Sequence, residues 1–397
     1  MEERGLPLAG LVVLDFSQYL AGPSCALRLA DLGADVIKVE RPQGGDACRS
    51  LVVADQRHEG DSALFHTINR NKRSFAADLK APADLARVRA LIGHADVMIH
   101  NFRPGVMERL GLDYASLAAA HPRLVYACVS GYGGEGPWRD KPGQDLLVQS
   151  LSGLAWLGGN AGDPPVPAGV SVIDILTGAH LVQGILAAVL RRERDGRGGL
   201  VEASLMESAL DLQFEPFTAF LNDPAGEQPR RSATSHANVH AAAPYGIYAT
   251  ADGYLALAMT PLDRLGELVG CEPLRAAAAA APDSWLRGRD RYKAMLAGHL
   301  AGRPTAHWLA LLEPAGVWCA DVLAWPELVR HPAFAALDMV QEIASAGGAR
   351  MRTTRCPIRI DGRRLRSPRG APRLGEHTED IAAAYRLPAT DTQETQA

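Results

Sequence analysis

The N-terminal part of the chain alternates short apolar runs with helical patterns. Apolar runs of strand length lie at 10–16 and 34–40, and a helical pattern over 24–32 that stops at Gly33 separates them. A strand, a helix and a second strand within about thirty residues form a βαβ unit, which places both strands in a parallel sheet. Further elements of these two kinds follow at 82–92, 96–100 and 124–129. The pattern therefore predicts an α/β domain built on a parallel sheet.

A long helical pattern begins beside Asp174. Apolar residues recur with helical spacing over 175–189, three arginines follow, and Gly196 provides a stop signal. Asp174 stands where a short apolar run, 170–173, opens into this helix, and there the unpaired N–H groups and the helix dipole favour a charged carboxylate. Such a carboxylate is either a simple N-cap or a nucleophile for covalent catalysis. This segment alone favours the N-cap.

The pattern changes after residue 221. Residues 222–243 are rich in Pro, Arg, Ser, His and Ala, which is typical of a linker. Strand-like runs on both sides of an Asp-Gly turn within 244–259 predict a β-hairpin, and Ala-rich helices follow over roughly 262–313. With 397 residues the chain exceeds what one core usually holds. We expect a large domain over 1–221, a linker over 222–243, a small domain over 244–330, and a return to the large domain over 331–397.

Composition and charge exclude several function classes. The apolar fraction of 47% and the charged fraction of 22% are ordinary for a globular protein, and the net charge of −4 is dispersed along the chain. These values give no electrostatic reason to expect binding to nucleic acid or to an anionic membrane. The six cysteines lie far apart without the spacing of metal ligands, so we expect free thiols, no metal and a reducing compartment.

The chain carries no sequence signal for export or membrane insertion. Its N-terminus is acidic and lacks the apolar core of a signal peptide. The longest apolar run, within 181–190, is too short to cross a bilayer. We therefore expect a cytoplasmic protein that is not in a membrane.

A glycine-rich loop over 131–136 matches the pattern GxGxxG and follows an apolar run, as a dinucleotide-binding fingerprint does. The surrounding context does not fit, however. A helix should open at the third glycine, whereas Pro137 and a second proline at 142 follow here, and no acidic residue closes a second strand at the expected distance. The loop therefore does not predict a nicotinamide cofactor.

Nine segments along the chain together carry a family resemblance. They read PLAGLVVLDFSQYLAGP, LADLGADVIKVERPQGGD, NRNKRSFAADLK, ADVMIHNFRPGVMERLGL, LVYACVSGYGGEGPW, PGQDLLVQSLSGL, VIDILTGAHLVQGILAAVLRRERDGRGG, YGIYATADGYLALAM and LGEHT. In this order they resemble the class III CoA-transferases, the family of formyl-CoA:oxalate and carnitine CoA-transferases, with the α-methylacyl-CoA racemases as cousins. The resemblance implies a Rossmann-like parallel sheet in the large domain, a smaller α+β domain inserted before the C-terminal segment, and an interlocked homodimer.

The resemblance also implies a set of site residues. Asp174 matches the carboxylate that takes the acyl group from a thioester. The positions that hold CoA correspond to Leu20, Ala21, Arg41, Leu79, Lys80, Asn101, Phe102, Arg103, Arg109, Lys141, Gln144 and Asp145. Arg and Lys are natural partners for the 3′-phosphate and diphosphate of CoA, and the Phe102 ring could stack on adenine. The CoA thioester enters as a substrate, and no cofactor is expected to be bound permanently.

Two positions favour a transferase over a racemase. A racemase exchanges an α-proton and needs two acid/base groups, and in that branch a histidine stands where this chain has Gln144. An amide cannot exchange a proton near neutral pH, and Thr250 replaces the glutamate of the racemases. We therefore expect CoA transfer from an acyl-CoA donor to a small carboxylic acid through an aspartyl intermediate. A racemase or epimerase, and a non-catalytic CoA-binding paralogue, stay open as alternatives.

The identity of the acceptor acid is less clear from the sequence. Enzymes of this family that use oxalate carry a run of glycines in the small domain, and the comparable segment 235–243 lacks it. His236 and His240 in this segment could bind an acceptor carboxylate, although a histidine in a linker is more often simply exposed. The sequence thus predicts a small dicarboxylate or hydroxy acid without selecting one.

Overall fold

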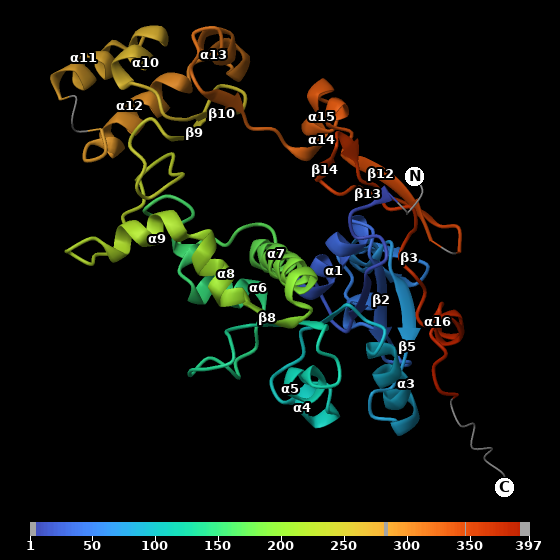
Figure 1. Cartoon of the computed structure of the whole chain (residues 1–397). Coiled ribbons are helices and arrows are strands. Elements are labelled where there is room, and N and C mark those ends of the chain that lie inside the picture. The colour runs from blue at the N-terminus through green and yellow to red at the C-terminus, as the bar shows by residue number, and fades with distance from the viewer. Residues whose placement is uncertain (1–4, 282–284, 346, 390–397) are drawn as a thin grey trace. The chain divides into compact units, whose positions relative to one another are not determined.

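The computed structural model describes residues 5–281, 285–345 and 347–389. The expectation that the chain has no signal peptide rests partly on residues 1–4, and these residues lie outside the described range. The chain divides into two compact units (Figure 1). The first comprises 1–145, 171–208 and 336–397, and the second comprises 146–170 and 209–335. The domain boundaries inferred from the sequence stay a prediction.

A six-stranded sheet forms the centre of the first unit. Its strands are β1 (Val12–Asp15), β2 (Asp35–Glu40), β5 (Arg73–Ala76), β6 (Val97–His100), β7 (Val125–Ser130) and β8 (Gly199–Ser204). They lie in the order β5-β2-β1-β6-β7-β8, and every neighbouring pair is parallel. The predicted α/β fold with a parallel sheet is confirmed. This is the strand order of doubly wound nucleotide-binding sheets, in which the order reverses between β1 and β6.

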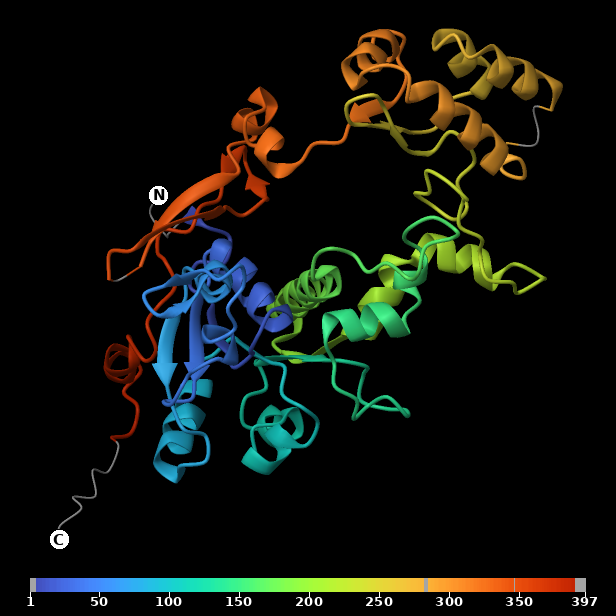
Figure 2. The same ribbon diagram turned by 180° about the vertical axis from the view of Figure 1, so that it is seen from behind.

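Helices cover both faces of this sheet (Figures 1 and 2). On one face α1 (Ala21–Asp31) packs against β1 and β2, while α7 (Val172–Asp195) packs against β7, β8 and α1. On the other face α3 (Pro82–Ile92) and α16 (Thr378–Ala384) join Leu14 of β1 in one apolar core. Alternate strand residues point to opposite faces, and the central strands β1 and β6 are buried on both sides, whereas Leu200 and Glu202 of the edge strand β8 are exposed.

Helix α7 is longer than the sequence pattern suggested. It begins at Val172 and runs for 24 residues, and by length and composition alone it could cross a membrane. The expectation that no apolar stretch is long enough to cross a bilayer was therefore wrong, because that expectation considered only the apolar run within 181–190. The contacts of α7 with β7, β8 and α1 identify it as a core helix of the α/β layers.

The second unit contains a small antiparallel sheet and several helices. Strands β9 (Gly246–Ala249) and β10 (Tyr254–Leu257) form the predicted hairpin, and β11 (Cys319–Asp321) pairs with β10. Helices α10 (Leu262–Leu268), α11 (Glu272–Ala280), α12 (Arg289–Leu300) and α13 (Thr305–Leu312) pack around the apolar core of this sheet. The helix expected over 144–157 is broken into α6 (Asp145–Leu151) and the 3₁₀ turn Leu154–Trp156. The break occurs because Gly153 has a φ of +84°.

The other elements are short connections. They are the 3₁₀ turn Ala47–Arg49, β3 (Arg57–His58), β4 (Asp61–Ser62), α2 (Ala63–Asn69), α4 (Val106–Leu110), α5 (Tyr114–Ala118), α8 (Leu205–Leu212), α9 (Phe214–Leu221), α14 (Trp325–Leu328), α15 (Pro332–Leu337), β12 (Val340–Ala344), β13 (Arg350–Thr354), β14 (Arg359–Ile360) and β15 (Arg363–Arg364). All six cysteines are free thiols, as expected.

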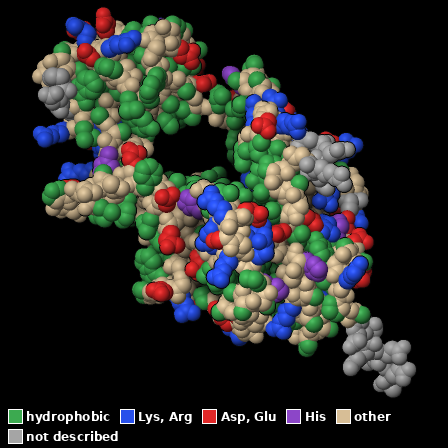
Figure 3. Space-filling model, viewed as in Figure 1, with side chains coloured by type: hydrophobic (Ala, Val, Ile, Leu, Met, Phe, Trp, Pro, Cys, Tyr) green, Lys and Arg blue, Asp and Glu red, His purple; other side chains and the backbone are tan. Residues whose placement is uncertain are grey.

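Charged side chains of both signs are dispersed over the face shown in Figure 3.

Candidate active site

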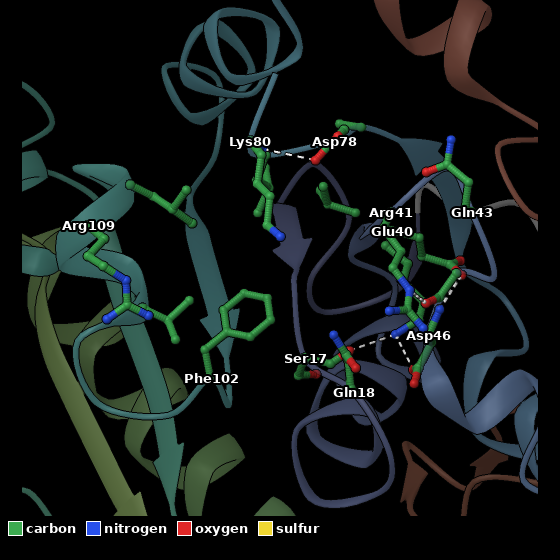
Figure 4. A pocket seen from close by; sticks show the side chains of 17 residues that line it. Ser17, Gln18, Glu40, Arg41, Gln43, Asp46, Asp78, Lys80, Phe102 and Arg109 are labelled. Carbon is green, nitrogen blue, oxygen red and sulfur yellow. Dashed lines mark hydrogen bonds and ion pairs between the residues drawn. The ribbon is translucent and has the colours of Figure 1, made fainter. Parts of the chain in front are cut away.

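Four neighbouring strands of the large sheet end at one cavity of about 660 Å³. The residues after β1, β2, β5 and β6 line it, together with part of α4. This is the edge where parallel strands end and where the strand order reverses, which is the usual ligand site of doubly wound folds. In Figure 4 Phe102 lies between Arg109 on one side and Gln18 and Arg41 on the other, with Lys80 above it.

The cavity presents cations that other side chains do not neutralise. Arg41, Lys80 and Arg109 are exposed, and within the described ranges none of them forms an ion pair. The Arg41 guanidinium donates one hydrogen bond, from Nε to the Gly45 carbonyl oxygen at 3.0 Å. The half-buried Phe102 ring stacks near the His100 ring, with centroids 6.1 Å apart. An aromatic surface beside three cations suits a ligand that carries both a base and phosphate groups.

A buried ionic network fixes the floor of this cavity. The Lys38 ammonium lies 2.8 Å from the Asp46 carboxylate and donates to the Ser17 carbonyl oxygen at 2.8 Å. Burial opposes the charge of Lys38, but Asp15 and Asp46 outweigh it and hold the Lys38 pKa above its usual value. The network thereby connects the end of β1 to the loop after β2.

Lys72 continues this network toward helix α1. Its ammonium donates to the Asp15 carboxylate, the Asn69 side chain and the Pro23 carbonyl oxygen at 2.8, 2.8 and 3.0 Å. Burial outweighs the attraction of Asp15 and lowers the Lys72 pKa to about 8. Sequence reasoning missed Lys38 and Lys72, because a lysine within or beside a strand looks like an ordinary surface charge.

Asp174 lies in the first turn of α7 and is half-buried. Its backbone N–H donates to Oδ2 of Asp145 at 3.0 Å, and the Ile173 N–H donates to the same oxygen at 2.8 Å. The N-cap position is Ser171, which makes no side-chain capping bond. The interpretation of Asp174 as the N-cap is therefore wrong, since the carboxylate of Asp145, distant in sequence, caps this helix.

The charge state of Asp174 also differs from the expectation. Burial, followed by the negative charge of Asp145, raises the pKa of the Asp174 carboxyl to about 7. The sequence suggested that the helix end would keep this carboxylate ionised. The structure differs because Asp145 takes two of the first-turn N–H groups and adds a like charge.

Helices α7 and α1 cross closely near Asp174. One turn after Asp174, α7 meets the start of α1 at Gly178, where an added Cβ would lie 2.8 Å from the Ala21 carbonyl oxygen and would overlap the Ser24 hydroxyl. Ala21 follows closely on Ser17 and Gln18, which line the cavity. Glycine at this crossing therefore lets α7, the helix that carries Asp174, pack closely on the start of α1.

Comparison with known proteins agrees with this geometry. The model of CoA-transferase family III matches residues 8–378. The chain belongs to CoA-transferase family III. As a member it is an enzyme of the CoA-transferase class, whose substrates are CoA thioesters.

Relatives of this CoA-transferase match over nearly their whole length. The succinate–glutarate CoA-transferase of Agrobacterium fabrum is 33% identical, covering 96% of each chain. The acetyl-CoA:oxalate CoA-transferase of Acetobacter aceti is also 33% identical, with 96% of both chains covered. A crystal structure of a CAIB/BAIF family protein from Brucella suis superposes with a TM-score of 0.79 at 30% identity, covering 96% of this chain and 99% of that one.

The structure brings together only part of the predicted CoA set of the transferase. Five of these residues line the cavity, namely Arg41, Leu79, Lys80, Phe102 and Arg109. The others lie outside its lining, namely Leu20, Ala21, Asn101, Arg103, Lys141, Gln144 and Asp145. Leu20 and Ala21 form the start of α1, Arg103 lines a neighbouring cavity, and Lys141 and Gln144 are exposed in the loop before α6.

Asn101 has a different local role from the one expected. Its side-chain amide accepts from the Gln18 N–H at 2.8 Å and donates to the Gln18 carbonyl oxygen at 2.7 Å. Both ends of the amide are thus used to join the loops after β1 and β6. Asn101 therefore positions Gln18, a cavity residue that sequence reasoning missed because it carries no charge or motif signal.

Proposed function

We propose that this CoA-transferase moves CoA from an acyl-CoA donor to a small carboxylic acid through a covalent intermediate on Asp174. The observation that supports this most is the place of Asp174, a half-buried carboxylate in the first turn of α7. At Gly178 this helix packs on the start of α1, a few residues after Ser17 and Gln18, which line the cation-bearing cavity. A positioned and partly desolvated carboxylate is a far better nucleophile toward a thioester than one free in water.

The reaction follows as two symmetrical halves. The Asp174 carboxylate attacks the donor thioester carbonyl, which gives a mixed anhydride and CoA thiolate. The thiolate attacks the aspartyl carbonyl and forms an aspartyl-CoA thioester, and the donor leaves as a free acid. The acceptor carboxylate then attacks this thioester, and the thiolate that it releases attacks the acceptor carbonyl. The new thioester leaves, Asp174 is again a carboxylate, and no net proton is consumed.

The cavity at the strand ends is the proposed site for the nucleotide part of CoA. Arg41, Lys80 and Arg109 would bind its phosphates, and Phe102 offers a ring face for adenine. The pantetheine arm would then run along the backbone at Leu20 and Ala21 toward Asp174. Asn101, Arg103, Lys141 and Gln144 keep their proposed roles near the ligand, with Asn101 acting through Gln18.

Dicarboxylates are the proposed acceptor acids. The relatives named above are called succinate–glutarate and acetyl-CoA:oxalate CoA-transferases, so each of those proteins is named for a dicarboxylate. In this chain His236 does not offer a free imidazole, because its ring nitrogens bond to the Ser232 N–H at 2.9 Å and the Leu157 carbonyl oxygen at 3.0 Å. His236 is therefore better explained as a structural residue than as an acceptor ligand.

We also propose a cytoplasmic homodimer. The six free thiols suit a reducing compartment. Helix α9 is strongly apolar, yet none of its residues is buried, and Phe214 and Leu221 are 69% and 64% exposed. A second copy of the chain would cover such a surface, and the family resemblance implies this arrangement. Light scattering should give twice the chain mass, and Phe214→Ser with Leu221→Ser should lower the melting temperature of the dimer, because interlocked chains separate only when they unfold.

Chemical trapping tests the proposed nucleophile. The enzyme is incubated with acetyl-CoA or succinyl-CoA and then with hydroxylamine, and its peptides are analysed by mass spectrometry. A hydroxamate on Asp174 supports the proposal, and Asp174→Ala should lose both the adduct and turnover while still binding CoA. A racemase would instead exchange the α-proton of an acyl-CoA with deuterium, without forming the adduct.

A further inference from the structure

Asp145 occupies an unusual place at the start of α7. Its side chain is 3% exposed, and its Oδ2 accepts hydrogen bonds from the Ile173 and Asp174 N–H groups at 2.8 and 3.0 Å. A carboxylate that receives two first-turn N–H groups is stabilised by them and by the positive end of the helix dipole. The same contacts fix the backbone of the residue that carries the proposed nucleophile.

The arrangement places two carboxylates at one helix end. The N–H groups that could have stabilised a charge on Asp174 are already used by Asp145. Asp145 also adds its own negative charge to the surroundings of Asp174. Two carboxylates in one site usually differ strongly in proton affinity, because ionising the second costs more than ionising the first.

Other titratable groups lie on α7 and α1. On α7 itself His180 lies further along the helix, with its Nδ1 3.0 Å from the Ser208 hydroxyl. On α1 the buried Cys25 keeps a neutral thiol, because burial raises its pKa well above the usual value. Asp145 is thus the charged neighbour that acts on Asp174 among the described residues of this unit.

We propose that Asp145 is a positioning residue: it holds the first turn of α7 through the Ile173 and Asp174 N–H groups and places its negative charge beside the proposed nucleophile Asp174. This inference rests on the proposed role of Asp174. It differs from the CoA contact that the family resemblance implies for Asp145. A more basic carboxylate attacks a thioester faster once it is ionised, and a protonated one does not attack.

The matched substitution is Asp145→Asn. It keeps an oxygen that can accept from the two N–H groups but removes the charge. The acid limb of the pH profile of kcat/KM should lie near pH 7 in the wild type, because burial and Asp145 raise the Asp174 pKa to about 7. In Asp145→Asn the limb should move lower by about one pH unit, the size of shift that one nearby charge produces.

A second helix cap provides the control. Asp113 caps α5 instead of α7, with its Oδ1 accepting from the Ser116 N–H at 3.1 Å. Asp113→Asn should leave the acid limb in place. Asp145→Ala, which removes both oxygens, should also lower the melting temperature. Asp145→Asn should melt at a temperature close to that of the wild type, because it keeps an oxygen that caps the helix.

The failure of this inference can be separated from the failure of the proposed function. The Asp174 pKa is also measured directly, by ¹³C NMR of aspartate-labelled resting enzyme assigned with Asp174→Asn. If Asp174 forms the hydroxamate but Asp145→Asn leaves both the NMR pKa and the acid limb unchanged, the role given to Asp145 is overturned. If the NMR pKa falls but the acid limb stays in place, the role of Asp174 as the nucleophile is overturned instead.

Discussion

The cavity at the strand ends and the first turn of α7 use charge in opposite ways. The cavity presents Arg41, Lys80 and Arg109 without ion-pair partners among the described residues, so its positive charge is available to a ligand. The start of α7 holds two carboxylates, and one of them, Asp145, takes the N–H groups that would stabilise the other. The proposed function thus separates binding from chemistry, with an anion-attracting surface in one place and a proton-sensitive proposed nucleophile in the other.

Removing the carboxylate of Asp174 should give the largest effect. Asp174→Ala should lower kcat by at least about 10⁴-fold, because covalent catalysis is lost when the nucleophile is absent. Its dissociation constant for CoA, measured by calorimetry, should change less than about threefold, since the cations of the cavity are untouched. If Asp174→Ala retained turnover, the chemistry would not depend on the first turn of α7, and the proposed division between binding and chemistry would be wrong.

The Lys72 network provides a test of how the cavity floor is held. Lys72→Met should lower the free energy of unfolding by about 3 kcal/mol, because it removes a fully buried partner of Asp15. The double variant Asp15→Asn with Lys72→Met should recover part of this loss, since no unpaired carboxylate is left behind. Denaturant titration measures the free energy of unfolding of both variants. Equal losses in the single and the double variant would contradict the role of the Lys72–Asp15 charge pair.

The crossing at Gly178 connects the two regions. Gly178→Ala should lower stability by about 2 kcal/mol, because the new Cβ would overlap the Ser24 hydroxyl at the start of α1. It should also reduce kcat more than it weakens CoA binding, since α7 carries Asp174. Gly298→Ala in α12, where no atom outside the helix's own backbone lies within 4 Å of the added Cβ, is the matched control; it should leave kcat unchanged and keep or slightly raise stability.

Single cation substitutions should have the smallest effects. Arg41→Gln, Lys80→Gln and Arg109→Gln should each weaken CoA binding by about tenfold, because each removes one charge from an exposed site. The loss should become smaller at high salt, where screening already weakens the interaction. Calorimetry at two ionic strengths measures this, and a loss of kcat without a loss of affinity would assign these residues to chemistry instead.

The cavity could be predicted from the sequence better than the helix end could. Arg41, Lys80 and Arg103 each follow an apolar strand-like run, and strand ends of a parallel sheet meet at one edge, so local pattern predicted them together. Arg41 and Lys80 do line this cavity, whereas Arg103 lines the neighbouring one. The capping of α7 by Asp145 depends on tertiary contact between segments distant in the chain, and no local rule predicts it.

Some residues of the site carried signals that pointed elsewhere. Lys38 and Lys72 are charged residues that the fold buries completely, and only the sheet topology brings them to Asp15 and Asp46. Gly153 is a helix-breaking signal within the expected helix over 144–157, and the apolar periodicity concealed it. Periodicity thus predicted the elements, while the buried polar contacts followed from the way in which those elements pack.

The most direct test of the central claim follows an oxygen atom. When the acceptor carboxylate attacks the aspartyl thioester, one of its oxygens bridges the anhydride and stays on Asp174 after the thiolate takes the acceptor acyl group. A single turnover with an ¹⁸O-labelled dicarboxylate should therefore add 2 Da to the peptide that contains Asp174, as measured by mass spectrometry. Turnover that leaves this peptide unlabelled would contradict a covalent aspartyl intermediate.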